Sequence, residues 1–320
     1  MKIVVLDHPR ENPGEIDWSR LSELGEATVH SRTPIDKLAE TIGDAEIVLL
    51  NKSPLTREVI EACPNLRFIS VIATGYNTVD VQAAKERGIP VANVPSYGTE
   101  AIGQHAVALL LEITDRVGYH DGEVRKGRRE SEGDWCFWDY PSIELENKTM
   151  GIVGLGRIGK TVARAGLAFG MKVIAVDAFQ SEEMIAAGVE YVDLDTLLAQ
   201  SDVISLHCPL FEETRHMINR EAIAKMKDGA ILINNSRGAL VDEQALADAL
   251  KSGKLYAAGL DALEVEPPKP DCPLLTAPNC YITPHISWAA LDCRRRLINY
   301  SIDNVEAWLN GAPTNIVNGV

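Results

Sequence analysis

Three glycines at residues 154, 156 and 159 could form the binding site of a phosphate-containing ligand. They stand in the order Gly154-x-Gly156-x-x-Gly159, after the apolar run Met150–Val153 and before a helical pattern. Gly154 would permit a tight turn, and Gly156 would let the backbone approach a pyrophosphate. Gly159 would let the following helix pack closely on the strand. The glycines alone are weak evidence, because a turn of this kind can also serve packing only.

An acidic residue stands where a dinucleotide site requires one. A second apolar run, Val173–Val176, ends at Asp177, which follows Gly159 by 18 residues. A carboxylate at this position would accept hydrogen bonds from both ribose hydroxyls of NAD. The helix that starts at Arg157 and Ile158 would direct its free N–H groups and its positive dipole end at the phosphates. Packing would not require the acid, so this segment predicts an NAD site.

Three further polar residues follow predicted strands and could carry acid–base chemistry. Arg237 comes after Ile231–Asn234, Glu266 after Gly259–Asp261, and His285 after Tyr281–Pro284. In open parallel sheets the ligand crevice lies beyond the carboxyl ends of the strands, so these side chains could converge there with the cofactor. Each residue alone has an ordinary interpretation: a surface ion pair, a solvated carboxylate and a structural histidine. Their joint position downstream of the glycine turn favours a catalytic set.

The elements that would position these residues alternate along the chain. Short apolar runs are separated by helical patterns, which predicts an α/β fold with parallel sheets. The runs are Ile3–Leu6, Ile47–Leu50, Phe68–Ile72 and Val91–Ala92, then Ile152–Val153, Val173–Val176, Val203–Leu206, Ile231–Ile233, Ala257–Leu260 and Tyr281–Ile282. A dinucleotide fingerprint normally opens its domain, yet here it begins near residue 148, so another domain must precede it. A last helical pattern, from about residue 289 to 310, could return to that first domain and make it discontinuous.

A helix and an aromatic segment lie between the two sets of strands. Apolar residues from Ile102 to Val117 fall on one helical face, and the helix is apolar over much of its surface. It should therefore pack against more than one neighbour. Residues 118–147 are interpreted as a polar loop with an aromatic cluster at Trp135–Tyr140. Such a loop is either folded back on its own chain or docked on a partner subunit.

Composition excludes several classes of function. The 320 residues carry 31 Lys and Arg against 46 Asp and Glu, a formal net charge of −15. This excess repels nucleic acid and anionic membranes, so neither is expected as a partner. The six cysteines form no CxxC pair and no Cys/His cluster with zinc spacing, which predicts reduced thiols in a cytoplasmic protein and no metal site. The start, MKIVVLDHPR, is too short an apolar run for a signal peptide, and no stretch is long enough to span a bilayer.

The order and spacing of several motifs resemble those of the D-isomer-specific 2-hydroxyacid dehydrogenases. The motifs are Thr74-Gly-Tyr-Asn-Thr-Val-Asp80, the glycine turn, Leu206-His-Cys-Pro-Leu210, Thr214-Arg-His-Met-Ile-Asn219, Asn234-Asn-Ser-Arg-Gly-Ala-Leu-Val-Asp242, Asp261 to Glu266-Pro, and Thr283-Pro-His285. The match covers nearly the whole chain. Within the family, Val91-Ala-Asn-Val-Pro-Ser-Tyr97 and Phe137-Trp-Asp-Tyr140 resemble the glycerate dehydrogenase/hydroxypyruvate reductase branch.

The resemblance implies two doubly wound parallel-sheet domains. A discontinuous, flavodoxin-like substrate-binding domain would comprise residues 1–98 and 289–320. A Rossmann NAD-binding domain, residues 99–288, would be inserted in it, and its segment 99–147 would build a homodimer. Two positions depart from the family pattern: Ala262 replaces a larger aliphatic residue, and Phe211 stands where a small or polar residue is common. Both are expected near the cofactor.

The resemblance also implies the residues of the site. The catalytic set would be Arg237, Glu266 and His285, with Arg237 and His285 also binding substrate. The cofactor-binding residues would be Gly154, Gly156, Arg157, Ile158, Gly159, Asp177, Pro209, Thr214, Asn235, Ser236 and Asp261. The substrate carboxylate would meet backbone N–H groups of the loop Thr74, Gly75 and Tyr76, where glycine allows close approach. Lys52 is a weaker candidate for the same crevice, since an exposed lysine is also typical of a surface.

The predicted reaction is hydride transfer between NAD and a small 2-oxo or D-2-hydroxy acid. His285 would donate a proton to the carbonyl oxygen during reduction, and Glu266 would fix its tautomer and favour its charged form. The rigid fork of Arg237 suits a planar carboxylate. Hydroxypyruvate/D-glycerate and glyoxylate/glycolate are the favoured pairs, and a D-lactate-type dehydrogenase is the alternative. A different class, a dinucleotide-sensing corepressor, uses the same fold and can retain these three residues.

Overall fold

The chain divides into two compact units, and the second is an insertion in the first. A computed structural model describes residues 1–8, 15–128, 133 and 135–320. The first unit comprises Met1–Gly98 and Ala289–Val320, and the second comprises Thr99–Trp288. No helix of these described residues is long and apolar enough to cross a membrane.

The first unit is a five-stranded parallel sheet with the strand order β2-β1-β3-β4-β5, which is the flavodoxin-like order. Its strands are β1 (Lys2–Val5), β2 (Glu26–Val29), β3 (Ile47–Leu50), β4 (Phe68–Val71) and β5 (Val91–Ala92). The helices are α1 (Ser19–Leu24), α2 (Leu38–Ile42), α3 (Arg57–Ala62), α4 (Val81–Glu86) and α13 (Leu291–Leu309). Every residue of β3 and β4 is buried, as expected for central strands covered on both faces.

Helix α13 explains why the first unit is discontinuous. Its apolar face packs with the residues of the first sheet, and the Trp308 ring stacks on Phe68 with 5.1 Å between ring centroids. Ser70 Oγ donates a hydrogen bond to the Ser301 carbonyl oxygen, and Asn304 Nδ2 donates one to the carbonyl of Asn93. The C-terminal helix therefore supplies one wall of the core that the first 98 residues begin.

The second unit is a seven-stranded parallel sheet with the order β12-β11-β10-β9-β6-β7-β8, the Rossmann order extended by one strand. Its strands are β6 (Thr149–Val153), β7 (Lys172–Val176), β8 (Glu190–Tyr191), β9 (Val203–Leu206), β10 (Ala230–Asn234), β11 (Leu255–Leu260) and β12 (Cys280–Ile282). Its helices are α5 (Thr99–Asp115), α6 (Val117–Arg125), α8 (Arg157–Ala168), α9 (Glu182–Ala186), α10 (Leu194–Gln200), α11 (Arg220–Lys225) and α12 (Glu243–Ser252). The predicted fold class, two doubly wound parallel sheets, is confirmed.

Helix α5 packs against more than one element of the second unit, as its broad apolar surface predicts. It packs against α8, β10 and β11. The approach to α8 is so close that a Cβ atom on Gly103 would lie 2.7 Å from the methyl carbon of Thr161. Glycine at this position therefore lets the two helices meet.

The prediction for the end of this helix was wrong. Helix α5 ends at Asp115, Arg116 has a left-handed backbone with φ of 49°, and Val117 is 67% exposed at the start of α6. The Arg116 guanidinium is buried over the Tyr140 ring, 3.6 Å from its centroid. Arg116 Nη2 also donates a hydrogen bond to Asn279. We attribute the break to this buried cation, which places Arg116 away from the helical path.

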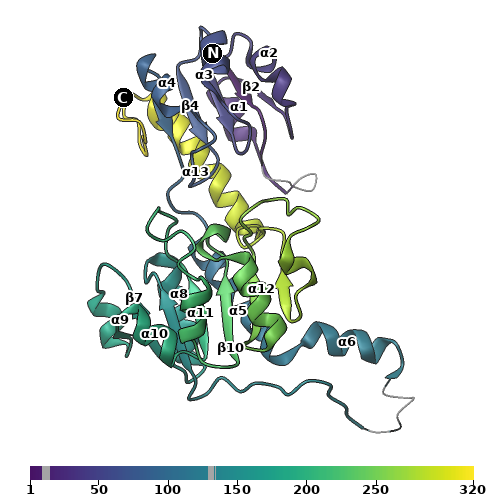
Figure 1. The fold of residues 1–320 in the computed structure, drawn as a ribbon. Helices are drawn as coiled ribbons and strands as arrows, with labels where there is room; N and C mark the ends of the chain where they lie inside the picture. Colours follow the sequence, from purple (N-terminus) through teal and green to yellow (C-terminus); the bar gives the residue numbers. More distant parts are fainter. Residues whose placement is uncertain (9–14, 129–132, 134) are drawn as a thin grey trace. The chain divides into compact units, whose positions relative to one another are not determined.

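Residues 118–125 were predicted as loop and are instead helical. Figure 1 shows α6 projecting away from the sheet of the second unit. The strands β2 and β8 were not predicted, because both are short edge strands with few buried residues. The aromatic segment beyond α6 is described only in part, since residues 129–132 and 134 lie outside the described residues.

Candidate active site

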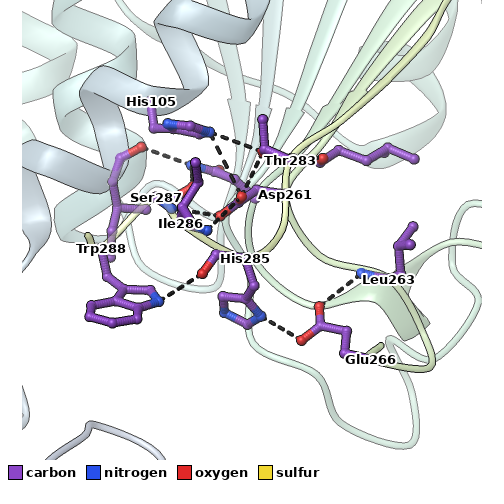
Figure 2. Close-up of polar contacts among 12 residues, drawn as sticks. His105, Asp261, Leu263, Glu266, Thr283, His285, Ile286, Ser287 and Trp288 are labelled. Carbon is purple, nitrogen blue, oxygen red and sulfur yellow. Dashed lines mark hydrogen bonds and ion pairs between the residues drawn. The ribbon is translucent and has the colours of Figure 1, made fainter. Parts of the chain in front are cut away.

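A buried carboxylate at the end of β11 holds the segment that carries His285 (Figure 2). Asp261 directly follows β11 and is 2% exposed. Its oxygens accept hydrogen bonds from Thr283 Oγ1 at 2.6 Å, from the backbone N–H of Ile286 at 2.8 Å and from that of Ser287 at 2.7 Å. A buried charge is tolerated only when it is paired or hydrogen-bonded, so this carboxylate dictates the path of the chain after β12.

His285 sits in a tight turn inside this segment. Its backbone has φ of 54°, and its N–H donates a hydrogen bond to the carbonyl of Thr283. Its own carbonyl accepts a hydrogen bond from the indole of Trp288 at 2.8 Å. Left-handed backbone at a residue other than glycine is uncommon and persists only where surrounding contacts hold it. These contacts orient the imidazole.

The imidazole of His285 pairs with Glu266. His285 Nδ1 lies 2.6 Å from Glu266 Oε2, and the two side chains are 38% and 36% exposed. Glu266 Oε1 accepts a hydrogen bond from the backbone N–H of Leu263 at 3.0 Å, so the carboxylate is itself fixed (Figure 2). Binding through Nδ1 leaves Nε2, at the other side of the ring, as the nitrogen directed away from Glu266. The pair has the geometry of a base with its orienting carboxylate.

Arg237 lies on the neighbouring loop, after β10. Its side chain is exposed, and its Nη1 donates a hydrogen bond to the carbonyl of Ser236. The next residue, Gly238, packs so closely that a Cβ atom there would lie 1.9 Å from the carbonyl carbon of Leu263. The loop of Arg237 is thus pressed against the loop that leads to Glu266. Because β10, β11 and β12 are adjacent, the structure brings the loops of all three predicted catalytic residues to one edge of the sheet.

The glycine turn has the steric form that a dinucleotide needs. Gly154 has φ of 93°, and a Cβ atom there would lie 2.5 Å from the backbone nitrogen of Cys208. A Cβ atom on Gly159 would lie 2.1 Å from the carbonyl oxygen of Gly154, so only glycine lets the helix begin so close to the turn. Gly156, in contrast, faces open space within 4 Å of its missing Cβ.

Asp177, which directly follows β7, accepts a hydrogen bond from the backbone of the glycine turn. Its Oδ2 accepts a hydrogen bond from the backbone N–H of Leu155 at 2.6 Å, and its Oδ1 accepts one from that of Phe179 at 3.0 Å. Each carboxylate oxygen can accept a second hydrogen bond. Helix α8 begins at Arg157, which Ile158 follows. Its N-cap residue, Gly156, has no side chain that could cap the first N–H groups of the helix. An open backbone, a helix start without a side-chain cap and a fixed carboxylate fit the phosphates and ribose of NAD.

Other predicted cofactor residues make contacts within the second unit. Thr214 Oγ1 donates a hydrogen bond to the carbonyl of Pro209, and Ser236 Oγ donates one to that of Cys208. Asn235 Nδ2 donates one to the carbonyl of Ile102, whereas its Oδ1 is buried without a partner among the described residues. Pro209, Thr214 and Ser236 keep exposed surface near the carboxyl ends of β9 and β10. Their contacts with the cofactor, and that of Asp261, stay predictions.

The predicted substrate residues Lys52, Thr74, Gly75 and Tyr76 lie in the first unit. All four are exposed and follow β3 or β4. A buried carboxylate that sequence reasoning missed, Asp7, supports this edge. It accepts hydrogen bonds from the backbone N–H groups of Asn51, Lys52 and Ser53 at 3.0, 2.6 and 3.2 Å. Its position directly after the first apolar run was the available signal.

Glu264 is a second residue that sequence reasoning missed. Its carboxylate pairs with Arg215 Nη2 at 2.6 Å and lies 3.1 Å from His216 Nε2. Its backbone N–H donates a hydrogen bond to Glu243 Oε1 at 2.8 Å. Glu264 therefore ties the loop before Glu266 to the loop after β9. The only signal in the sequence was a second acid two residues before Glu266.

His207 lies beside the glycine turn and is held neutral. Its Nε2 is 2.8 Å from Ser205 Oγ, and its backbone N–H donates a hydrogen bond to the carbonyl of Val153. Burial of the ring lowers the pKa of His207 to about 4, although the residue as a whole keeps some accessible surface. Burial also raises the pKa of the neighbouring Cys208 thiol to about 11, so it stays protonated at neutral pH.

The family of the chain follows from comparison with known proteins. A family model described as "D-isomer specific 2-hydroxyacid dehydrogenase, NAD binding domain" matches residues 107–287. This match covers more than half of the chain. The chain therefore belongs to the D-isomer specific 2-hydroxyacid dehydrogenases, NAD-dependent enzymes that interconvert 2-oxo acids and D-2-hydroxy acids.

Individual relatives are similar along most of their length. The chain is 57% identical over 321 residues to hydroxypyruvate reductase of Blautia hydrogenotrophica, with 99% of this chain and 100% of that protein covered. It is 40% identical to glycerate dehydrogenase of Methylorubrum extorquens, with 88% of each covered. The solved structure of D-lactate dehydrogenase from Aquifex aeolicus, complexed with NAD and lactic acid, matches with a TM-score of 0.83 at 32% identity and covers 99% of both chains.

We predict that His207 makes the protein less stable as the pH falls from 6.5 to about 4. In this range the unfolded chain binds a proton at residue 207 and the folded chain does not, so acid favours unfolding. One proton corresponds to a slope of at most about 1.4 kcal/mol per pH unit. Urea unfolding at a series of pH values gives the free energy of unfolding as a function of pH. Its slope between pH 6.5 and about 4 should be smaller for His207→Gln than for the native protein. His30→Gln, in the other unit, is the control, and parallel curves for the native protein and His207→Gln would contradict the prediction.

Proposed function

We propose that this enzyme reduces hydroxypyruvate to D-glycerate with NADH. The observation that carries the proposal is the 2.6 Å contact between His285 Nδ1 and Glu266 Oε2 beside the loop of Arg237. Relatives with the names hydroxypyruvate reductase and glycerate dehydrogenase support this substrate pair. A protein from Korarchaeum cryptofilum with the name glyoxylate reductase is 42% identical over 88% of the chain, so glyoxylate is the second candidate.

In this proposal His285 transfers the proton, and Glu266 orients His285 and stabilises its charged form. NADH supplies the hydride that reaches C2 of the oxo acid. The carbonyl oxygen then gains negative charge, and Nε2 of the His285 imidazolium donates a proton to it. Glu266, hydrogen-bonded to Nδ1, keeps the ring in this orientation and stabilises the imidazolium before transfer. In the reverse direction neutral His285 accepts the proton of the hydroxyl group.

In this proposal Arg237 binds the carboxylate of the substrate. The guanidinium fork can bind both carboxylate oxygens while it polarises the neighbouring carbonyl. In the first unit, the loop Thr74, Gly75 and Tyr76 offers backbone N–H groups to the substrate, and Lys52 offers a cation. Their exposure at the carboxyl ends of β3 and β4 supports this assignment.

The residues proposed to bind NAD are those of the glycine turn and its neighbours. Gly154, Gly156 and Gly159 shape the turn, and the first residues of α8, Arg157 and Ile158, offer N–H groups to the phosphates. Asp177 accepts from the ribose hydroxyls. Pro209, Thr214, Asn235, Ser236 and Asp261 complete the set. The unsatisfied Asn235 Oδ1 supports a role for this amide, because a buried acceptor without a partner is costly.

A substrate panel tests the proposal. Oxidation of NADH is followed with hydroxypyruvate, glyoxylate, pyruvate and phosphohydroxypyruvate, and kcat/KM is compared. Hydroxypyruvate should give the largest value. A larger value for pyruvate would favour a D-lactate-type dehydrogenase, and a larger value for glyoxylate would favour a glyoxylate reductase. His285→Gln should lower the rate by a factor of about 10² to 10⁴, the usual scale of general acid–base catalysis.

We also propose a homodimer in the cytoplasm. The support for the dimer is an exposed apolar surface on α6 and the aromatic segment: Val117 is 67%, Val124 48%, Trp135 80% and Trp138 70% exposed. Apolar groups of this size in one region are typical of an interface. All six cysteines are free thiols, which supports a reducing compartment.

We predict that Glu266→Gln shifts the pH profile of reduction to lower pH. Reduction requires the imidazolium of His285, and the carboxylate of Glu266 stabilises that charged form. Glutamine keeps a hydrogen-bond acceptor but removes the negative charge, so the variant stabilises the charged form of the ring less. kcat/KM is measured against pH in both directions, and oxidation should show the matching shift. Asp271→Asn, an exposed acid in the following loop, is the control. An unshifted or alkaline-shifted reductive limb in Glu266→Gln would refute the role of this pair.

We predict a preference for NADH over NADPH that depends on Asp177. Its charge would repel a 2′-phosphate, and the next residue is Ala178 rather than arginine. Asp177→Asn retains an oxygen acceptor for one of the backbone contacts and removes the repulsion. The ratio of kcat/KM for NADPH to that for NADH should rise about tenfold. Asp228→Asn replaces a 90% exposed acid that pairs with Lys254; it controls for net charge and should leave the ratio unchanged. Native enzyme that uses NADPH as well as NADH would disprove the preference.

We predict that a charge on α6 dissociates the dimer. Val124→Glu places a carboxylate in the proposed interface, where burial of an unpaired charge is unfavourable. Light scattering should give the mass of two chains for the native protein and a shift towards one chain for the variant. Ile35→Glu is the matched control, because Ile35 is a 71% exposed aliphatic residue in the first unit. A native protein that is monomeric at micromolar concentration would end this proposal.

A further inference from the structure

A histidine on helix α5 contacts the segment that carries His285. His105 points from the helix towards Thr283 and Asp261 (Figure 2). Its Nε2 lies 3.1 Å from Thr283 Oγ1 and 3.7 Å from Asp261 Oδ1. Helix α5 precedes every strand of the second sheet, whereas Thr283 directly follows the last one, β12. The contact therefore joins the two ends of the second unit beside the proposed catalytic loop.

The partners of Thr283 assign the direction of this hydrogen bond. The Thr283 hydroxyl has one hydrogen, and its oxygen lies 2.6 Å from Asp261 Oδ1, which accepts. That hydrogen belongs to the bond with Asp261, so Nε2 of His105 carries the hydrogen that Thr283 Oγ1 accepts. Two hydrogen bonds thus run in one direction, from His105 through Thr283 to the buried carboxylate. Hydrogen bonds in such a chain polarise and strengthen one another.

Thr283 is also the residue on which the turn of His285 closes. The backbone N–H of His285 donates a hydrogen bond to the carbonyl of Thr283 at 2.9 Å. The N–H of Thr283 itself donates one to the carbonyl of Leu260 at 2.9 Å. The left-handed backbone of His285 persists only where its surroundings hold it. A bond that fixes the side chain of Thr283 therefore also fixes the base of this turn.

Helix α5 is a firm support for the contact, because it packs against α8, β10 and β11. A second link joins the helix to the same segment. Asn235 Nδ2 donates a hydrogen bond to the carbonyl of Ile102 at 2.8 Å and lies 3.3 Å from Ser287 Oγ. The segment 283–287 is thus connected to α5 directly through His105 and indirectly through Asn235.

We propose that His105 is a positioning residue for His285. Its hydrogen bond to Thr283 keeps the turn in the geometry that places Nδ1 of His285 on Glu266 and leaves Nε2 for proton transfer. This inference rests on the proposed role of His285 in the reaction. His105 makes no contact with the substrate in this proposal and acts through Thr283. Without the His105 N–H, Thr283 has one partner fewer and the turn is held less firmly.

Steady-state kinetics of the full-length enzyme with NADH and hydroxypyruvate test the inference. His105→Leu removes the N–H donor, and His105→Asn shortens the side chain so that its amide falls short of Thr283. His105→Gln places a side-chain N–H where Nε2 was. Gln104→Leu is the matched control, because Gln104 is an exposed residue of the same helix. Calorimetry with ADP-ribose, which lacks nicotinamide, shows whether each variant keeps a folded nucleotide site.

The expected result is a loss of kcat without a loss of substrate binding. His105→Leu and His105→Asn should lower kcat about tenfold, the upper range for one hydrogen bond. The KM for hydroxypyruvate should stay within about twofold, because the contact affects proton transfer rather than binding. His105→Gln should restore kcat to within about twofold of the native value. Gln104→Leu should match the native enzyme, and the Kd of ADP-ribose should be the same for all variants.

A double-mutant cycle separates positioning from a general loss of stability. Glu266→Ala removes the group to which the turn is proposed to align His285. In that background His105→Leu should lower kcat by less than about threefold, since the two residues would act through one geometry. Residues that act independently have effects that multiply, so the full tenfold loss would recur.

The outcomes distinguish this inference from the proposed function. A kcat within about twofold of the native value in both His105→Leu and His105→Asn overturns it. A loss that His105→Gln does not restore, or that recurs in full with Glu266→Ala, assigns His105 to the packing of α5 and also overturns it. The expected pattern with glyoxylate, in an enzyme that does not reduce hydroxypyruvate, contradicts the proposed substrate and leaves the role of His105 standing.

Discussion

The candidate site depends on buried or half-buried carboxylates. Each of them follows one strand and accepts hydrogen bonds from the loop that follows an adjacent strand. Asp261, after β11, binds the segment that follows β12. Asp177, after β7, binds the backbone N–H of Leu155, which follows β6. Asp7, just after β1, binds three N–H groups of the loop after β3 in the other unit. In each case the carboxylate needs donors, the loop needs acceptors, and parallel pairing brings the two together at one edge of the sheet.

This arrangement explains how loops can present side chains in a defined orientation. Loops lack the ladder of hydrogen bonds that fixes a strand, so an irregular segment needs other partners for its backbone. The Asp261 carboxylate supplies them for the N–H groups of Ile286 and Ser287, and the Trp288 indole adds a contact to the carbonyl of His285. The unfavourable left-handed conformation of His285 is then tolerated, because the alternative would leave a buried charge without donors.

Much of the fold could be predicted from the sequence because the central strands are continuous apolar runs. The runs that became β3, β4, β9 and β10 are fully buried, and their alternation with helical patterns implies parallel sheets. The edge strands β2 and β8 were missed, since a partly exposed edge has no such run. The helix break at Arg116 was also missed, because it depends on contacts with Tyr140 and Asn279, which are distant in the sequence.

The residues of the candidate site also divide into those that the sequence could predict and those that it could not. His285, Glu266 and Arg237 could be found because each follows a strand in a recognisable motif. The supporting residues Asp7 and Glu264 could not be assigned a role, because the partners of their carboxylates lie 44 to 49 residues away. Gly238 illustrates the same difficulty: its need for glycine arises from the loop at Leu263, which the sequence does not place next to it.

The three catalytic candidates differ in how firmly the protein holds them. His285 and Glu266 are fixed to each other, and their loops are bonded through Asp261, Trp288 and Leu263. Arg237 is exposed, and among the described residues its guanidinium contacts only the carbonyl of Ser236. The groups assigned to proton transfer are thus set before substrate arrives, where small errors in geometry are costly. The group assigned to the substrate carboxylate retains rotamer freedom, and a bidentate carboxylate contact can supply the energy to order it.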